Sequence, residues 1–254
     1  MLSANEIKLV RSLSEKKFRD KTGLFIAEGE KMTDEALRSG FTVKKLYRRD
    51  EIGEDTMKRI SATSSGTPSL AVIHKPLDIN IEDSSSCIDT SYSSGLFLAL
   101  DSIRDPGNLG TILRIADWFG IDAVFASKDT VDLFNPKVVQ ATMGAIFRVK
   151  FHYTDIPSLC SAVRKSGGQV YGTFLDGDDI YESDIAAGDK GISLIVIGNE
   201  SEGISEAVES EVTGRLFIPR YPAEREGSES LNAAVATAVT VAEFRRRAAM
   251  RQGR

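Results

Sequence analysis

The sequence predicts an α/β protein in two parts: a small N-terminal α/β domain and a larger C-terminal domain with a parallel sheet. Two observations predict this division. The C-terminal part alternates apolar, strand-like runs with helical segments, the pattern of a parallel sheet covered by helices on both faces. A serine-rich stretch without periodicity, residues 83–95, has the composition of a linker. We therefore expect domains over residues 1–82 and 96–254.

The N-terminal part is expected to contain two helices and three strands. A helix is predicted over residues 3–20, where Ile7, Val10 and Leu13 are spaced by three and form an apolar stripe. A second helix is expected to end at Gly40, because glycine is a frequent residue at helix C-termini. Strands are predicted at 24–29, 43–48 and 69–76.

The C-terminal part repeats strand and helix signals regularly. The predicted strands are 96–101, 122–127, 148–154, 169–175, 193–199 and 214–219. The predicted helices are 109–120, 135–145, 156–167, 204–212 and 230–247. Ligands of such sheets bind outside the carboxyl ends of the strands. Three polar loops of this chain follow predicted strands and are therefore the first candidates for a site.

Composition limits the class of protein. The chain has 254 residues, of which 41% are hydrophobic and 27% charged, as in ordinary globular proteins. We see no apolar run near the roughly 20 residues that a membrane helix needs, and no signal peptide, so we expect a cytoplasmic protein. Cys87 and Cys160 are far apart, and His74 and His152 are isolated. We therefore expect neither a disulfide framework nor a metal site.

The distribution of charge leaves two interpretations open. The formal net charge of −5 argues weakly against a nucleic-acid partner. Residues 1–49, however, contain twelve Lys and Arg against seven Asp and Glu, a local net charge of +5. This basic segment is either an RNA-binding surface or a solvated helical face.

The first candidate loop precedes the helix predicted at 109–120. Asn108 is expected to cap that helix. Arg114 lies off the apolar stripe of the helix, where its forked guanidinium could reach an anion at the strand ends. An ordinary turn followed by a surface arginine would give the same local pattern.

The second and third loops are rich in glycine and small polar residues. Gly198 follows a predicted strand and would let backbone approach a ligand closely. The segment has neither the dinucleotide-binding GxGxxG pattern nor the GK[ST] ending of a P-loop. In the third loop a strand ends at Ile218-Pro219, and a helix begins near Ser230-Leu231-Asn232. A capped C-terminal helix without a ligand is the alternative for this loop.

Together the three loops resemble the motifs of the SpoU/TrmH family of RNA ribose 2′-O-methyltransferases, within the SPOUT superfamily. The first motif, N-x-x-G-x-x-x-R-x-A, is similar to residues 108–116, with a shorter gap between Asn108 and Gly110. The second, G-N/S-E-x-x-G, is matched by residues 198–203, and the third by Ile218-Pro219 with Ser230-Leu231-Asn232. The resemblance covers about residues 96–247. The loop between Pro219 and Ser230 departs from it, because it is longer and more charged.

This resemblance implies a fold, a cofactor and a set of site residues. It implies a SPOUT domain with a C-terminal trefoil knot, a small N-terminal domain for RNA binding, and a homodimer. The methyl donor would be S-adenosylmethionine (SAM), and the substrate a structured RNA, ribosomal RNA of the 23S type before transfer RNA. The residues implied to contact SAM are Thr173, Gly198, Ile218 and Leu231. The implied catalytic residues are Asn108, Arg114, Glu200, Ser230 and Asn232.

The chemistry of a ribose hydroxyl is consistent with this set. The hydroxyl needs positioning, an anchor for the adjacent phosphate and loss of a proton, and no metal. We expect Arg114 to bind the phosphate and Glu200 to hold its guanidinium. Two alternatives remain: an RNA-binding protein of this fold that has lost catalysis, and a nucleotide-dependent enzyme such as a dehydrogenase. The missing GxGxxG argues against the second.

Overall fold

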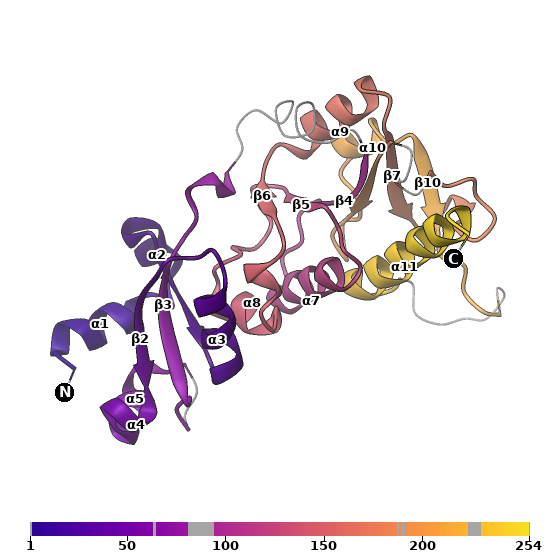
Figure 1. The fold of residues 1–254 in the computed structure, drawn as a ribbon. Helices are drawn as coiled ribbons and strands as arrows, with labels where there is room; N and C mark the ends of the chain where they lie inside the picture. The colour runs from indigo at the N-terminus through magenta and orange to yellow at the C-terminus, as the bar shows by residue number, and fades with distance from the viewer. Residues whose placement is uncertain are drawn as a thin grey trace.

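The computed structural model describes residues 2–62, 65–80, 94–186, 188, 191–222 and 230–253. It contains a three-stranded antiparallel sheet and a seven-stranded parallel sheet, so the predicted α/β class is confirmed (Figure 1). The expected linker, 83–95, lies almost wholly outside the described residues, and the domain boundaries stay a prediction. Among the helices of the described ranges, none combines the length and apolarity that crossing a bilayer requires.

The N-terminal part packs short helices around a small sheet with the strand order β1-β3-β2. Its strands are β1 (Leu24–Glu28), β2 (Val43–Arg48) and β3 (Ser69–His74). Its helices are α1 (Ala4–Ser12), α2 (Lys16–Thr22), α3 (Glu30–Arg38), α4 (Arg49–Ile52), α5 (Glu54–Ile60) and the 3-10 turn η1 (Leu77–Ile79). All three predicted strands are present. Helices α4 and α5 were not predicted.

The single helix predicted over residues 3–20 is wrong, because the chain breaks between α1 and α2. The backbone carbonyls of Leu13 and Ser14 accept hydrogen bonds from Nη1 of Arg19, at 2.9 and 2.8 Å. The guanidinium of Arg19 therefore supplies these two carbonyls with donors in place of the backbone N–H groups of a continuous helix. The expected apolar stripe is nevertheless correct, since Ile7, Val10 and Leu13 are all buried.

The end expected for the next helix is also shifted. Helix α3 ends at Arg38, and its C-cap is Ser39 rather than Gly40. The Ser39 hydroxyl donates to the carbonyl of Ala36 at 2.7 Å and accepts from the N–H of Phe41 at 3.1 Å. The hydroxyl thus turns the chain out of the helix without a glycine in the left-handed conformation.

The C-terminal part is the predicted parallel sheet, with the strand order β6-β5-β4-β9-β7-β10-β8. Its strands are β4 (Gly95–Leu100), β5 (Ala123–Ala126), β6 (Phe151–Tyr153), β7 (Gln169–Phe174), β8 (Asp178–Asp179), β9 (Ile192–Ile197) and β10 (Gly214–Phe217). Its helices are α7 (Pro106–Trp118), α8 (Pro136–Ala141), α9 (Ile156–Lys165), α10 (Glu206–Glu209) and α11 (Ala233–Arg251), with the 3-10 turn η2 (Ala145–Phe147). The six predicted strands are all present, and β8 is an additional short one.

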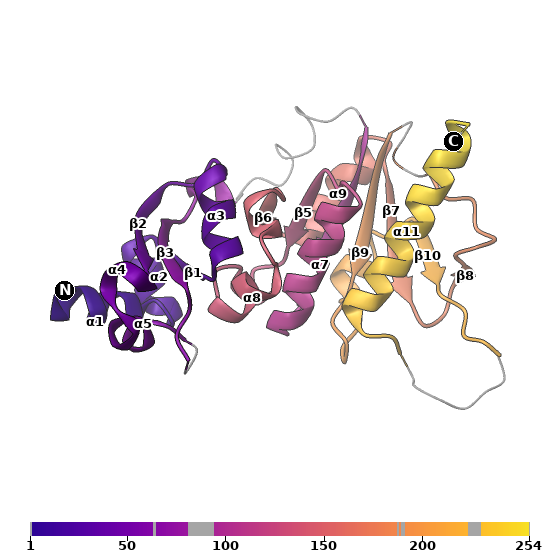
Figure 2. The same cartoon turned by 60° about the horizontal axis from the view of Figure 1, so that its bottom comes forward.

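Helices cover both faces of this sheet, as the apolar strand pattern requires. Alternate residues of β4 belong to different apolar clusters: Leu98 packs in the cluster that includes α7 and α11, and Phe97 in the one that includes α9. Helices α7 and α11 lie side by side across the sheet (Figure 2). One face of the sheet is therefore covered by α7, from the start of the C-terminal part of the chain, and α11, from its end.

In the C-terminal half of the sheet, strands that are neighbours in space are not consecutive in the chain. Strand β9 lies between β4 and β7, and β10 lies between β7 and β8. Chain crossings of this kind are a condition for the trefoil knot that the family resemblance implies. Knots are nearly absent from folds in general, and the knot here stays a prediction.

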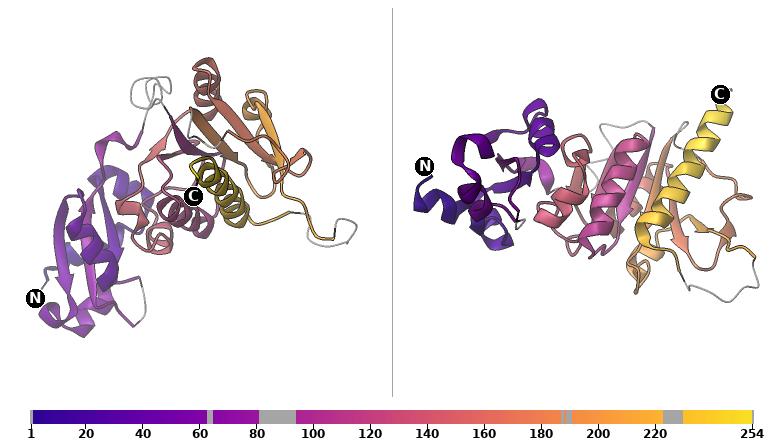
Figure 3. Two further views of the ribbon diagram at one scale, coloured as in Figure 1. Left: turned by 45° about the vertical axis from the view of Figure 1, so that its right-hand side comes forward. Right: turned by 90° about the horizontal axis from the view of Figure 1, so that it is seen from below.

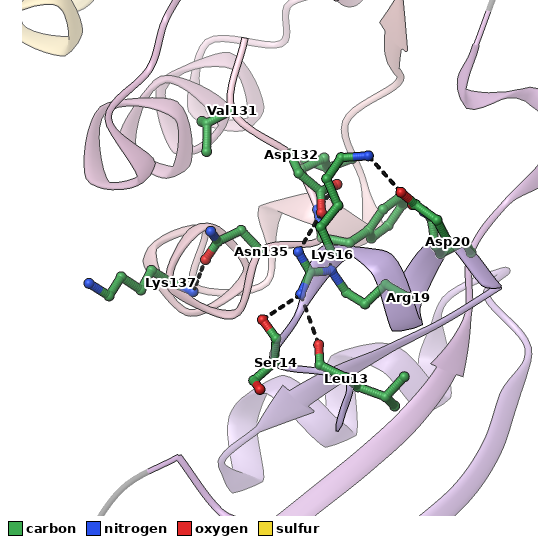
Figure 4. A network of polar contacts seen from close by, with 12 residues as sticks. Leu13, Ser14, Lys16, Arg19, Asp20, Val131, Asp132, Asn135 and Lys137 are labelled. Atoms are coloured by element: carbon green, nitrogen blue, oxygen red, sulfur yellow. Dashed lines mark hydrogen bonds and ion pairs between the residues drawn. The ribbon is translucent and has the colours of Figure 1, made fainter. Parts of the chain in front are cut away.

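The two parts of the chain share one apolar core. Phe25 of β1 packs on Phe134, with ring centroids 4.6 Å apart, and both belong to the same buried cluster. Beside them Arg19, only 2% exposed, donates from Nε and Nη2 to Oδ2 of Asp132, at 3.1 and 2.7 Å (Figure 4). The N-terminal part is thus fixed against one end of the parallel sheet, and the two chain termini lie at opposite ends of the molecule (Figure 3).

Candidate active site

A cavity of about 940 Å³ opens at the carboxyl ends of β7, β9 and β10. This is the edge of the sheet where ligands of parallel sheets bind. All four residues expected to contact SAM line the cavity, each from a different segment: Thr173, Gly198, Ile218 and Leu231. Glu200 and Ser230 line it as well, whereas Asn108, Arg114 and Asn232 do not.

The turn after β9 requires glycine at its first position. A Cβ atom on Gly198 would lie 2.4 Å from the carbonyl carbon of Gly203, which is closer than any real contact. The backbone N–H groups of Asn199 and Gly203 each donate to the carbonyl of the other, at 3.0 and 2.9 Å. Gly203 has a φ of +72°, the left-handed region that favours glycine. The two glycines therefore close a tight turn against the cavity.

Asn199 ties this turn to the loop after β4. Its side-chain oxygen accepts from the backbone N–H groups of Ser201 and Glu202, at 2.9 and 3.1 Å. Its Nδ2 donates to the carbonyl of Ser102 at 2.8 Å. Ser102 itself has a φ of 61°, which is rare for a residue other than glycine. The first and second loops are thus held together by a buried amide.

Asp105, not Asn108, caps helix α7. Oδ1 of Asp105 accepts from the backbone N–H of Asn108 at 2.8 Å, so Asn108 lies inside the first turn. The expectation that Asn108 caps the helix is wrong. The helix begins earlier, at Pro106, and Asp105 is its N-cap. The side chain of Asn108 is consequently available for contacts with other loops.

These contacts join the three predicted loops in one network. Nδ2 of Asn108 donates to the carboxylate of Glu200 in the second loop. Oδ1 of Asn108 accepts from Nδ2 of Asn232 in the third, at 2.8 Å. Asn232 also caps α11, its Oδ1 accepting from the N–H groups of Ala234 and Val235 at 3.0 and 3.3 Å. Three of the five expected catalytic residues therefore lie within hydrogen-bonding distance of a neighbour, next to the cavity.

Arg114 is placed differently from the expectation. The carboxylate of Glu200 accepts from Asn108, not from Arg114. Arg114 is exposed on α7, and within the described part of the chain no hydrogen bond or ion pair involves its guanidinium. The fork of donors therefore faces solvent, where it can bind an anion. Trp118, one helical turn further along, is 85% exposed.

A second connection between the first two loops was not expected. Nη1 and Nη2 of Arg104 donate to the two carboxylate oxygens of Glu202, at 2.8 and 3.0 Å. Oδ2 of Asp101, a buried residue, accepts from the N–H of Ser205 at 2.7 Å. Nothing in the local sequence indicates these pairs, because their members are about a hundred residues apart.

Arg215 forms a charged edge of the same cavity. Its guanidinium stacks on the ring of Phe174, 3.6 Å from the ring centroid, and donates to Glu209 and to Asp176. Hydrogen bonds to these two carboxylates raise the pKa of Arg215 above its ordinary value, so the group stays protonated. The positive charge is thereby balanced within the protein and is not directed at a ligand.

The lining fits a nucleoside that carries a sulfonium group. Ile218 and Leu231 offer apolar surface to a purine ring, Gly198 lets backbone groups approach closely, and Glu200 places a negative charge beside a cationic ligand. No group of three His, Cys, Asp or Glu residues suited to a metal occurs in the ranges that the structure describes.

Comparison with known proteins assigns the chain to a family. The model of the SpoU rRNA methylase family matches residues 95–242, more than half of the chain. The chain belongs to this family. The N-terminal residues 4–77 match a second family model, the MRM3-like substrate binding domain.

Members of the family and of related groups align along nearly the whole chain. The 23S rRNA guanosine 2′-O-methyltransferase RlmP of Bacillus subtilis is 31% identical, over 94% of this chain and 96% of its own. A TrmH-family structure from Porphyromonas gingivalis is 38% identical with a TM-score of 0.84, covering 97% of this chain and 99% of that one. An AdoMet-bound rRNA methyltransferase from Sinorhizobium meliloti is 28% identical with a TM-score of 0.82, covering 97% and 96%.

Proposed function

We propose that this protein transfers the methyl group of SAM to a ribose 2′-hydroxyl of ribosomal RNA, of the 23S type rather than transfer RNA. The observation that carries this proposal is the Asn108–Glu200–Asn232 network beside a cavity lined by the expected SAM residues. The similarity to RlmP, which acts on 23S rRNA by name, supports the choice of RNA.

The cofactor, when bound, supplies an electrophilic methyl group on a positively charged sulfur. We assign Thr173, Gly198, Ile218 and Leu231 to hold it in the cavity. Of these four positions, that of Gly198 tolerates substitution least, because its contact with Gly203 leaves no room for a side chain. Glu200 adds a carboxylate that favours a cationic donor.

The protein's groups then have to orient the ribose and receive its proton. We assign Arg114 to the phosphate next to the target ribose, because two parallel donors fix an anion in one orientation. Arginine stays protonated, with a pKa above about 12, and is a poor base. Once the ribose oxygen had accepted the methyl group that a bound cofactor would supply, its hydroxyl proton would be strongly acidic. A carboxylate is then a sufficient acceptor, and we assign Glu200, held by Asn108, to this step.

Mapping of 2′-O-methyl groups tests the reaction. Total RNA from cells with and without this gene is compared nucleotide by nucleotide, and we expect one ribose of the large ribosomal RNA to lose its methyl group. SAM calorimetry in the presence of a chelator accompanies it. SAM binding without any missing methyl group would favour an RNA-binding protein that has lost catalysis.

We further propose that residues 1–82 form the RNA-binding domain and that the protein works in the cytoplasm, where ribosomal RNA is. The match of residues 4–77 to a substrate-binding family supports the first assignment. Deletion is a poor test, because removing these residues would expose Phe134, which packs on Phe25. Replacing surface lysines is preferable, and RNA affinity should fall while SAM affinity stays constant.

A homodimer is also proposed. Helices α7 and α11 expose Trp118, Leu231 and Val235 on or beside them, and a second copy could bury this apolar surface. Several small residues of α11 are already buried within the chain, Ala233, Ala234 and Thr237 among them, and these are not available for pairing. Light scattering at micromolar concentration should give about twice the chain mass of 27.7 kDa.

A further inference from the structure

Arg114 and a second unpaired cation, Lys137, each lie one helical turn from the contact between α7 and α8. Gly110 of α7 faces Ala141 of α8 so closely that a Cβ atom on Gly110 would lie 2.4 Å from the Cβ of Ala141. Residues four apart on a helix share a face. Arg114 therefore lies one turn, about 5.4 Å, beyond the contact on α7, and Lys137 one turn before it on α8.

Lys137 is exposed and has no hydrogen bond or ion pair from its side chain to any described residue. Only its backbone N–H is engaged, as a donor to Oδ1 of Asn135, which caps α8. Figure 4 shows its ammonium group pointing away from the neighbouring network around Arg19. The lysine is thus presented to solvent, one turn before the residue of α8 that contacts α7.

Three acidic groups near this crossing are already paired with arginines. Asp117 of α7 and Glu35 of α3 both accept from Arg148. Asp132, before α8, accepts from Arg19. Arg114 and Lys137 have no partner among the described residues, and both are positive. An anionic chain is the complement of such a surface.

Met143 is an exposed apolar residue just beyond the C-cap of α8. It follows α8 directly, is 44% exposed and has a φ of 51°, a backbone conformation that is unfavourable for a bulky side chain. Strained residues persist where the surrounding structure holds them, and they cluster at functional positions. An exposed, polarizable thioether at the end of α8 is suited to contact with an unstacked base.

We propose that the α7–α8 crossing is an RNA-binding surface that flanks the target nucleotide. Lys137 binds a backbone phosphate adjacent to the one assigned to Arg114, and Met143 contacts a neighbouring base. The proposal rests on the proposed methyl transfer to RNA and names three groups that the target segment meets outside the cavity.

The test uses the full chain and an in-vitro transcript of 23S rRNA as the probe. In Lys137→Ala one phosphate contact is lost, so RNA affinity should fall roughly fivefold at about 0.1 M salt, and the slope of log affinity against log salt should shrink by about 0.7. The matched control is Lys165→Ala. Lys165 is an exposed lysine of α9, on the opposite face of the sheet, and both quantities should stay at the wild-type values.

Met143→Gly separates the base contact from a structural role. Glycine relieves the positive φ, so the thermal midpoint should stay the same or rise. We expect KM for the transcript to increase several-fold while SAM affinity is unchanged. A variant that is as stable as wild type with an unchanged KM would refute the role of Met143, and an unchanged salt slope in Lys137→Ala would refute that of Lys137. Failure of the wild-type protein to bind or methylate the transcript would instead overturn the proposed function itself.

Discussion

Two arginines of the chain, Arg19 and Arg114, show opposite arrangements. Arg19, at the junction of the two parts of the chain, is 2% exposed and donates four hydrogen bonds, to Asp132 and to two carbonyls. Arg114, on the same helix as Asn108, is exposed and has no partner among the residues described. All donors of a buried arginine need acceptors within the protein, whereas an exposed arginine can leave its donors to a ligand. The comparison separates an arginine that holds the fold from one that we assign to the substrate.

The largest expected effect concerns Arg114. In Arg114→Lys the charge remains but the forked pair of donors is lost, so the ribose would no longer be aligned. We expect single-turnover methyl transfer to fall about a thousandfold, with SAM affinity by calorimetry and the thermal midpoint unchanged. Transfer at nearly the wild-type rate would show that Arg114 supplies only diffuse positive charge.

The next effect concerns Arg19 and appears in stability rather than catalysis. Arg19→Met leaves the carboxylate of Asp132, which is 11% exposed, without its partner. Removing one member of a buried pair costs about 3–5 kcal/mol, which corresponds to a fall of roughly 10 °C in Tm. The double variant Arg19→Met/Asp132→Asn should recover part of this loss, because the uncompensated charge is gone. A single variant with the wild-type Tm would contradict the assignment.

A smaller effect is expected within the polar network. Asn108→Asp replaces the donor that faces Glu200 by a second carboxylate, and the two negative charges repel each other. Methyl transfer should fall about 10–100-fold, roughly the loss of one charge-assisted hydrogen bond with added repulsion. Asn80→Asp, at an exposed position away from the cavity, is the control and should methylate at the wild-type rate.

The smallest effect concerns an exposed ion pair that links α1 to β2. A hydrogen bond from Lys45, together with those from Ser3, lowers the pKa of Glu6 from 4.5 to about 2. A lowered pKa in the folded state stabilises the protein above pH 4.5, and this contribution is lost as the pH falls towards 2. Carboxyl titration by NMR should place the midpoint of Glu6 near 2. In Lys45→Met the midpoint should return towards 4.5, with little change in Tm because exposed pairs contribute little.

The sequence predicts most of the fold because the strands of the large sheet are almost wholly apolar. Strand β9 is buried along its whole length, and its continuous apolar run can be recognised as a strand from the sequence alone. Strand β8 was missed because its two residues, Asp178 and Asp179, have no apolar signal. The break between α1 and α2 was missed because Arg19, six residues away, supplies the donor that ends the helical bonding.

The motifs of the site could be found from the sequence, but their internal contacts could not. Asp105 and Asn108 are both good caps, and only the position of the first helical turn decides between them. The pairing of Asn108 with Glu200 depends on the adjacency of β4 and β9, which are far apart in the chain. The same holds for Arg104 and Glu202.

The position of Trp118 gives the molecule an intrinsic optical reporter. It is the one tryptophan of the sequence, 85% exposed, and it lies one turn beyond Arg114 on α7. Its indole fluorescence should therefore be that of a fully hydrated ring while this face is bare. Association of a second copy, or of RNA, over this part of α7 would shift the emission to the blue or quench it. Dilution and RNA titration could then be followed on the unmodified chain, without an attached dye.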